Sequence, residues 1–475
     1  MMVRSRCLLV SCLIVFHISL KGQDAQYWSQ QYGTRSTLLG GVVIGSVEDL
    51  GATYYNPARL ALVPDLSFLL SAKVYELESF SLKNSSEQGA AVNNYSVGVA
   101  PNLAAGTISP SNREDQRIAY SFLTRQRADF RLDFTEFDTL DIIQGDPGDE
   151  LVGASGALNQ KVDENWFGAS YAKPFSRHLS WGVSGFVTVR SQRTNRRYLV
   201  ETFNANGNVG ILNQISNFQY NVWGLVFKGG LAYEKDPWSA GLTITTPRIR
   251  LFGQGSVEFN TAQAGVDVDG DGTDDDRLIV QFQEKVKAFS RLAMSIGAGA
   301  AYRIKGNKIH VSAEWFPSVA SYHIMDPRDF LNQITRDTLS RTIVDETNAV
   351  FNFGLGYEGT LAKRWSIYGA FSTDNSAVSD NQGGLFDTGE DSVSSSLAFW
   401  DLFHLSTGTA FTWNRADITL GLIYSAGRDD VFLPIDLPEQ GNAFSRGDEG
   451  RFTYRRLRLI FGFAFNFGPK KSDSP

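Results

Sequence analysis

A run of carboxylates in the middle of the chain is the clearest candidate for chemistry. Residues 267–276 read Asp-Val-Asp-Gly-Asp-Gly-Thr-Asp-Asp-Asp. Calcium prefers six to eight oxygen ligands, and an interposed glycine allows a tight turn. The twelfth position of an EF-hand loop would be Leu278 instead of a bidentate glutamate, so the run is not an EF-hand. We expect either a calcium loop of another kind or a solvated acidic loop. The candidate ligands are Asp267, Asp269, Asp271 and Asp275.

Enzyme signatures in the sequence are weak. Gly354, Gly356 and Gly359 spell a dinucleotide fingerprint, but they lie on a predicted strand with no helix after it. His404 and Ser406 could form a hydrolase pair, yet the sequence offers no evident third partner. The remaining histidines after the leader lack metal-motif spacing: His178, His310 and His323. We therefore expect a protein that is not an enzyme and that requires no cofactor.

Charge and hydropathy exclude two further classes. The chain has 475 residues, with 44 basic and 51 acidic side chains and a net charge of −7. This balance argues against nucleic-acid binding, which needs a basic face. The mean hydropathy of −0.19 is too polar for a helical membrane bundle. An aromatic content of 12% in a polar chain is instead typical of a membrane β-barrel, whose strands face lipid on one side and water on the other.

The first residues are predicted to form a signal peptide, 1–22. Arg4 and Arg6 precede a short apolar core from Leu8 to Leu20, too short for a comfortable membrane helix. A lipoprotein signal ending at Cys12 is an alternative. Both cysteines of the chain fall in this leader, so the mature protein would have no disulfides and no thiolate sites.

Period-two alternation recurs along the chain and is clearest in its last predicted strand. Alternate positions there form an apolar strip, while the other parity is basic, small or polar. Similar strips recur upstream, and many begin or end in Trp or Tyr, as interfacial aromatic girdles do. The apolar strip consists of Leu457, Leu459, Phe461, Phe463, Phe465 and Phe467.

The connections give a second, independent signal for a barrel. Short connections at 175–178, 234–237, 304–307 and 414–415 alternate with long ones such as 128–164, 247–289 and 374–402. This is the turn-and-loop pattern of outer-membrane barrels. A secreted β-sandwich also alternates, but its strands are usually shorter. We predict an all-β fold: a transmembrane antiparallel β-barrel of about 14 strands over residues 64–467, followed by a short periplasmic tail at 468–475.

Residues 23–63 do not alternate, and they carry a resemblance. Glu48-Asp49 and Tyr55-Asn56-Pro57-Ala58, just before the first predicted strand, resemble the FadL/TodX family of outer-membrane transporters of hydrophobic compounds. Ala240–Thr243 and Asp401–His404 with Gly408 are similar to strands of that family. The resemblance implies an N-terminal plug that carries the motif Asn56, Pro57 and Ala58. Without the family, Asn before Pro simply predicts a turn. The tail after Phe467 and the pair Arg59-Leu60 depart from the family pattern.

Lumen-facing parity predicts a cationic interior. If the apolar strips face lipid, seven charged residues point inward, because a charge facing lipid would cost a few kcal/mol at the midplane. They are Lys73, Arg117, Arg125, Lys228, Glu314, Arg456 and Arg458. These could pair with Glu48 and Asp49 of the predicted plug. Alternatively, a ligand-binding group of Lys73, Arg125, Arg456 and Arg458 could hold an anionic head group.

The resemblance favours a passive channel for hydrophobic or amphiphilic small molecules, such as long-chain fatty acids. We expect a multi-pass protein in the outer membrane of a Gram-negative bacterium, with membrane lipid as a partner and no nucleic acid. The alternative is a structural or secretion-associated barrel that binds a protein partner through its loops.

Overall fold

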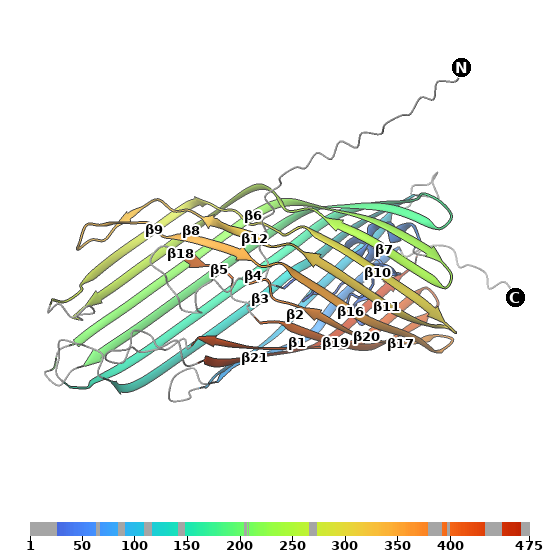
Figure 1. The fold of residues 1–475 in the computed structure, drawn as a ribbon. Helices are drawn as coiled ribbons and strands as arrows, with labels where there is room; N and C mark the ends of the chain where they lie inside the picture. Colours follow the sequence, from blue (N-terminus) through green and yellow to red (C-terminus); the bar gives the residue numbers. More distant parts are fainter. Residues whose placement is uncertain are drawn as a thin grey trace, which may run out of the picture.

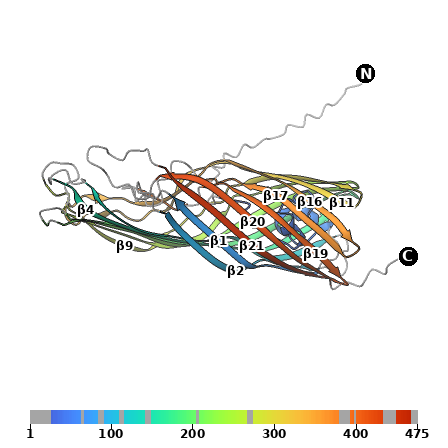
Figure 2. The same ribbon diagram turned by 90° about the horizontal axis from the view of Figure 1, so that it is seen from below.

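The structure, a computed structural model, describes residues 26–62, 67–83, 91–108, 116–140, 148–203, 207, 209–265, 273–378, 392–396, 400–432 and 449–466. The predicted signal peptide and C-terminal tail lie outside these ranges. Figure 1 shows a tube of tilted strands with a short helical segment, coloured blue, inside one end. Figure 2 shows the same segment enclosed by the strands from a second direction.

Among the described residues, fourteen antiparallel strands form a closed wall, as predicted. Each strand pairs with its neighbours along the wall, and β21 pairs with β1 to close it. The strands are β1 (Phe68–Lys83), β2 (Ala91–Ile108), β3 (Arg117–Leu140), β4 (Glu150–Pro174), β5 (Leu179–Phe203), β6 (Val209–Lys235), β7 (Trp238–Thr245), β10 (Ser295–Ile304), β11 (Asn307–Phe316), β16 (Val350–Ala362), β17 (Trp365–Asp374), β19 (Leu402–Trp413), β20 (Ala416–Phe432) and β21 (Glu449–Phe465).

The short connections lie at one end of the barrel, which we call the short-turn end. The tightest of them joins β10 to β11 through Lys305 and Gly306, whose φ angles of 46° and 87° are both left-handed. Two consecutive positive φ angles are what a two-residue hairpin needs, and glycine adopts one of them without strain. The predicted short connections in the described part of the chain therefore lie together at the short-turn end.

The predicted long connections contain strands that the sequence pattern did not reveal. β3 to β6 have 24 to 27 residues, far more than the roughly ten that cross a membrane. They extend the wall beyond the membrane, so the predicted loop 128–164 is mostly strand. The predicted loop 247–289 contains the hairpin of β8 (Ile249–Ala264) and β9 (Arg277–Lys287). These parts face water outside the barrel, so they lack the apolar strip that reveals a membrane strand.

β7 and β8 run in the same direction along β6 and are separated by a break at Pro247. Lys228 pairs with Thr245, and Leu225 pairs with Ile249. Proline lacks the N–H that would continue the ladder. The break turns the side chain of Arg248 into the lumen, where it is fully buried.

A small inner sheet lies on the far side of the lumen from the short turns. It consists of β12 (Val319–Met325), β15 (Thr342–Thr347) and β18 (Ser392–Ser394), beside a short hairpin of β13 (Phe330–Leu331) and β14 (Thr338–Leu339). Just after β18, the carbonyl of Ser395 accepts hydrogen bonds from Gln160 at 2.7 Å and Gln192 at 2.8 Å. Residues 392–396 therefore connect β15 to the inner face of β4 and β5.

The outer surface carries a belt of exposed apolar side chains. Leu457 and Phe461 are 41% and 42% exposed, whereas the intervening Arg456 and Arg458 are 4% and 0% exposed. Trp181, Trp223, Trp315 and Trp365 also point outward. So many exposed large apolar side chains on a closed wall indicate a lipid-facing surface. None of the helices in the described part of the chain has the length and apolar run needed to cross a bilayer.

Residues 26–62, here called the inner segment, lie inside the short-turn end of the barrel. They contain α1 (Arg35–Leu38), α2 (Ala52–Tyr55) and the 3-10 helix η1 (Pro57–Ala61). Leu38, Leu50 and Tyr32 are at most 1% exposed and belong to a cluster shared with inward residues of the wall, such as Leu123 and Trp166. The segment thus packs against the inner side of the wall, and its action as a plug stays a prediction.

Candidate functional site: the barrel lumen

Asn56 of the Asn-Pro-Ala motif joins the inner segment to the wall. Its side-chain Nδ2 donates to the carbonyls of Ile44 at 2.9 Å and Leu231 at 3.0 Å. Its Oδ1 accepts from the N–H of Ala58 at 3.1 Å and so caps η1, with Pro57 at the first helical position. The motif therefore forms the turn that the sequence predicts, and it also contacts β6.

Three glycines of the wall make room for this motif. A Cβ at Gly182 would lie 2.5 Å from the carbonyl carbon of Pro57. A Cβ at Gly230 or Gly241 would lie 2.1 or 2.5 Å from the amide group of Asn56. Such distances are far inside van der Waals contact, so only glycine lets the motif seat against β5, β6 and β7.

Further close contacts hold the rest of the inner segment. A Cβ at Gly45 would lie 2.3 Å from the carbonyl oxygen of Gly299 on β10, and Leu38 lies 2.6 Å from the position of a Cβ on Gly408. Gly241 and Gly408 belong to the two stretches that are similar to FadL/TodX strands. The parts of the sequence that carry the resemblance thus meet at one place, the contact between the inner segment and the wall.

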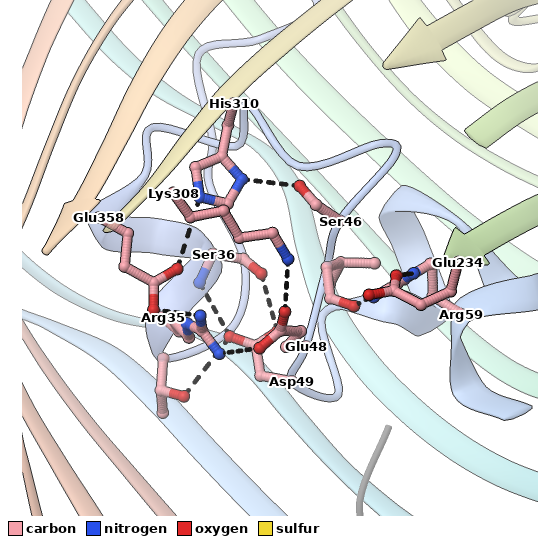
Figure 3. A network of polar contacts seen from close by, with 12 residues as sticks. Arg35, Ser36, Ser46, Glu48, Asp49, Arg59, Glu234, Lys308, His310 and Glu358 are labelled. Atoms are coloured by element: carbon pink, nitrogen blue, oxygen red, sulfur yellow. Dashed lines mark hydrogen bonds and ion pairs between the residues drawn. The ribbon is translucent and has the colours of Figure 1, made fainter. Parts of the chain in front are cut away.

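An ionic network surrounds the inner segment near the short turns (Figure 3). Arg35 pairs with Glu48 and with Glu358 of β16. Lys308 of β11 lies 2.6 Å from Glu48. Arg59 pairs with Glu234 at the end of β6. The network links the segment to three strands, and Glu48 contacts these cations instead of the lumenal arginines.

Asp49 has a different role from Glu48. It is 2% exposed and accepts hydrogen bonds from the N–H and hydroxyl of Ser36, each at 2.9 Å, and from the N–H of Gly51 at 2.9 Å. Burial raises the pKa of Asp49, while these hydrogen bonds oppose the rise. Asp49 therefore organises the inner segment itself and does not pair with the predicted lumenal cations.

Acidification should weaken the attachment of the inner segment through Glu48. Burial tends to raise the pKa of Glu48, but Arg35 and Lys308 outweigh it and hold the pKa well below its ordinary value of 4.5. A carboxyl group whose pKa is depressed in the folded arrangement stabilises that arrangement at pH values above its ordinary pKa. This stabilisation is lost as the pH falls from the ordinary pKa toward the depressed pKa. We expect planar-bilayer recordings to show several-fold more frequent openings at pH 3.5 than at pH 7.

Two variants isolate this effect from other carboxylates. Glu48→Gln should open frequently already at pH 7, with a reduced response to acid. Lys308→Gln removes the same contact from the opposite partner and should behave similarly at pH 7. An unchanged pH response in Glu48→Gln would contradict the prediction.

The structure brings Arg456 and Arg458 together. They donate to one acceptor, the carbonyl of Ser29, at 3.0 Å and 2.8 Å. Arg456 also lies 3.6 Å from Glu78, and Glu76 stands opposite Arg458 in the pairing of β1 with β21. The predicted pairing with Glu48 and Asp49 is therefore replaced by a carbonyl of the inner segment and by carboxylates of β1.

The other two predicted members of this group lie elsewhere or outside the described side chains. Lys73 is on β1 beside a register shift, and its side chain is outside the described part of the structure. Arg125 is the extra residue of a β-bulge, because Thr124 and Gln126 pair with consecutive residues of β4. Its carbonyl lies 3.4 Å from the hydroxyl of Tyr32. Of the four predicted cations, the structure thus brings Arg456 and Arg458 together at the carbonyl of Ser29, and the ligand-binding role of the four stays a prediction.

A buried ion-pair group, which sequence reasoning missed, ties the strand break to β4 and β5. Glu164 of β4 is 0% exposed and pairs with Arg248 and, at 3.1 Å, with Arg190 of β5. It also accepts a hydrogen bond from the indole N–H of Trp166 at 2.6 Å. The inward parity of β4 would have predicted the orientation of Glu164, but nothing local predicts its distant partner.

His404 does not pair with Ser406 as the sequence suggested. It lies beside a different serine and an aspartate. Ser406 donates to the carbonyl of Leu38 at 3.0 Å. His404 lies 2.7 Å from Ser425 and 3.5 Å from Asp374, and Asp374 accepts from the N–H of Trp28 at 2.8 Å. These groups are buried beneath the inner segment, so they hold Trp28 in place.

Beyond the inner segment, apolar side chains line part of the lumen, beside buried polar residues such as Gln160, Gln192 and Arg196. The lumenal aromatic cluster comprises Phe80, Phe130, Leu132, Leu158, Trp400, Leu402, Phe452 and Tyr454. The Trp400 and Phe452 rings are centred 4.4 Å apart, and those of Phe80 and Phe130 are 4.9 Å apart. A second apolar cluster on the β6–β9 side includes Tyr220 and Phe259. Water-filled barrels have polar interiors, so this lining suits an apolar content.

The space around the inner segment is narrow. A cavity beside Tyr54, Lys228 and Glu314 has a volume of about 10 Å³, room for about one water molecule. Lys228 lies 3.8 Å from Glu314 and 4.8 Å from the centre of the Tyr54 ring. The inner segment is thus closely packed against the wall beside these residues.

The acidic run can be assessed only in part. Asp267, Asp269 and Asp271 lie outside the described residues, and Asp275 lies just inside them. Within the described ranges, no group of three or more His, Cys, Asp or Glu side chains is placed to hold a metal ion. The calcium loop stays a prediction.

Comparison with known proteins identifies the architecture. No protein-family profile matches the chain, and no curated protein matches it. A FadL homologue from Pseudomonas aeruginosa superimposes with a TM-score of 0.54 over 94% of this chain and 100% of its own, at 10% identity. The chain has the fold of the FadL and TodX channels.

Two toluene transporters have the same fold. The P. putida transporter TodX matches with a TM-score of 0.55 at 11% identity, over 93% of this chain and 99% of its own. The Ralstonia pickettii transporter TbuX matches with a TM-score of 0.54 at 12% identity, over 92% and 99%. The resemblance seen in Asn56-Pro57-Ala58 is thus matched by the course of almost the whole chain.

Proposed function

We propose that this protein is a passive outer-membrane channel for hydrophobic and amphiphilic small molecules. The lumenal aromatic cluster carries the proposal, because an apolar lining inside a membrane barrel favours apolar solutes over ions and sugars. The fold neighbours that are named as toluene transporters support the same substrate class. No covalent step is needed, and we expect neither catalysis nor a cofactor.

Amphiphilic acids are the proposed preferred substrates. Arg456 lies at the edge of the aromatic cluster, with its guanidinium 5.8 Å from the centre of the Tyr454 ring. An acid could place its chain among the rings and its carboxylate against Arg456 and Arg458, in competition with Glu78 and the carbonyl of Ser29. Arginine suits a carboxylate through paired hydrogen bonds.

Binding of a matched ligand pair tests this function. We expect a long-chain acid to bind the purified protein about tenfold more tightly than its methyl ester, since a hydrogen bond to a charged group contributes about 1.5 kcal/mol or more. Quenching of Trp400 fluorescence, taken as the difference between the wild type and Trp400→Phe, reports occupancy of the cluster.

Substitutions separate the two parts of the site. Leu158→Gln places an amide in the aromatic cluster and should weaken both ligands, whereas Arg456→Ala with Arg458→Ala should weaken only the acid. Leu361→Gln, at a 71% exposed position near the short turns, is the matched control and should change neither. Full binding by Leu158→Gln would contradict the lumenal site. A wild type that binds neither ligand but retains a protein partner would favour the secretion-associated alternative.

A further inference from the structure

A hollow lies on the side of the barrel away from the short turns, next to the strand break. Its volume is about 420 Å³, and it lies between the segment that joins β9 to β10 and the strand β12. Ala288 and Ser290 of that segment are buried, and Ser290 contacts Arg248 in the lumen. Phe289 and Arg291 are partly exposed and line the hollow.

Three cations lie against two aromatic rings that line this hollow. The cations are Arg250, Lys287 and Arg291, and the rings are those of Phe289 and Tyr322. We call these five residues the cationic groove. Arg250 and Lys287 lie 4.5 Å and 5.0 Å from the centre of the Phe289 ring. Arg291 lies 4.3 Å from the centre of the Tyr322 ring. A cation stacked on an aromatic face is attracted to the ring and so held in position.

Arg250 of the groove is held by uncharged acceptors, which leave its positive charge unbalanced. Arg250 donates to the carbonyls of Ala288 at 2.7 Å and Gly253 at 3.0 Å, which are uncharged acceptors. The Nη1 of Arg291 is buried, and within the described residues it has no hydrogen-bond partner. The carboxylate that lines the groove is Asp326, and it lies 3.9 Å from His323. The groove therefore presents more positive than negative charge.

The position of the groove along the barrel axis indicates which part of the membrane it faces. Phe252 is two residues from Arg250, is 57% exposed and stacks on Trp223 at 5.4 Å. These outward rings belong to the upper edge of the apolar belt, where side chains meet lipid head groups. In the proposed orientation, with the short turns in the periplasm, this edge lies in the outer leaflet.

We propose that the cationic groove binds the phosphorylated head group of an outer-leaflet lipopolysaccharide. The phosphate would take hydrogen bonds from Arg250 and Arg291 and the charge of Lys287, while the acyl chains follow the apolar belt below. Arginine binds phosphate through paired donors. Each cation near an anionic membrane surface contributes about a fivefold gain in affinity. The proposal relies on the outer-membrane location but not on transport through the lumen.

A binding comparison with three probes tests the groove. The full-length protein in detergent is titrated with bisphosphorylated lipid A, with the same lipid after removal of its phosphates, and with inorganic phosphate as competitor. We expect Arg250→Gln, Lys287→Gln and Arg291→Gln together to weaken binding of the phosphorylated lipid roughly a hundredfold. Lys287→Gln alone, at an exposed position, should weaken it about fivefold, which keeps the test valid if the triple variant fails to fold.

Charge-matched controls decide the result. Arg303→Gln, Lys305→Gln and Arg364→Gln together remove three exposed cations at the short-turn end and should leave lipid binding unchanged. The proposal is overturned if this control loses as much affinity as the groove variant, or if the dephosphorylated lipid binds equally well. Complete displacement by equimolar inorganic phosphate would also overturn it, in favour of a site for free phosphate. Acid binding in the lumen is measured separately, so the two proposals can fail independently.

Discussion

Replacing Gly182 by valine should unseat the inner segment and make the barrel leaky. A Cβ at this position meets the backbone of Pro57 at 2.5 Å, and backbone cannot rotate away as a side chain can. Overpacking of this kind costs about 1–3 kcal/mol. Each 1.4 kcal/mol changes a population about tenfold, so the open form should become roughly ten- to a hundredfold more frequent. Swelling of proteoliposomes in a small sugar measures the leak.

Gly229 provides a matched control within the same region of the wall. It precedes Gly230 on β6, but a Cβ there would meet only Ile244, at an ordinary distance of 3.6 Å. Gly229→Val should therefore leave the barrel closed. Equal leak rates in the two variants would show that the close fit of Pro57 does not hold the inner segment. Heat-modifiable mobility on gels verifies that both barrels are folded.

Glu164→Gln should produce the largest loss of stability among single substitutions in the lumen. The change removes the negative charge between Arg190 and Arg248, whose side chains are 4% and 0% exposed. Breaking a buried ion pair by removing one partner costs about 3–5 kcal/mol, because the remaining charge is buried without compensation. The free energy of unfolding in urea, monitored by the folded band on gels, should fall by about this amount.

The neighbouring Asp163 serves as the control for Glu164. It lies on the opposite face of β4, with a side chain that is 32% exposed and cations at 3.8 Å and 4.0 Å. Exposed pairs contribute about 0–1 kcal/mol. Asp163→Asn should thus shift the unfolding midpoint little, and comparable shifts in the two variants would argue against the buried network as a main support of the strand break.

Alternation predicted the wall of the barrel well because lipid imposes it. Each membrane strand must show an apolar face to the bilayer, so the outward strip with Leu457 and Phe461 and the inward Arg456 and Arg458 could be read directly. Where the wall leaves the membrane this constraint ends. The extensions of β3 and β4 continue pairing as far as Leu140 and Glu150, but their outer faces meet water and show no apolar strip.

The site was less predictable, because it depends on irregularities and on distant partners. The register shift between Lys73 and Tyr75 reverses the parity of β1 and places Glu76 and Glu78 beside the arginines of β21. A bulge leaves no mark in a pattern of polar residues. Likewise, the contact between Arg248 and Glu164 spans 84 positions in sequence. The pairing of β4 with β5, of β5 with β6 and of β6 with β8 brings the two residues together.

The resemblance to the FadL/TodX family pointed to the contact of Asn56-Pro57 with the wall. Physical reasoning from the sequence alone predicts only a turn at these residues. Asn56-Pro57 is a turn in isolation, yet Gly230 and Gly241 are the complementary half of the motif. A glycine in a strand has several possible causes, including a bulge or a close approach of another chain segment. Its cause becomes visible only when the facing residue is known.

The seam between β1 and β21 sets the order in which this molecule can assemble. The seam pairs Phe68 with Phe465, so it can close only when two strands that lie far apart in the sequence are both in place. Until then both strands expose edges that can pair with other chains, and contacts so distant in sequence form slowly. The inner segment touches strands from both halves of the wall, from Gly182 on β5 to Gly408 on β19. It can therefore gather the strands around itself while the seam is still open, so that the closed barrel is built around its contents.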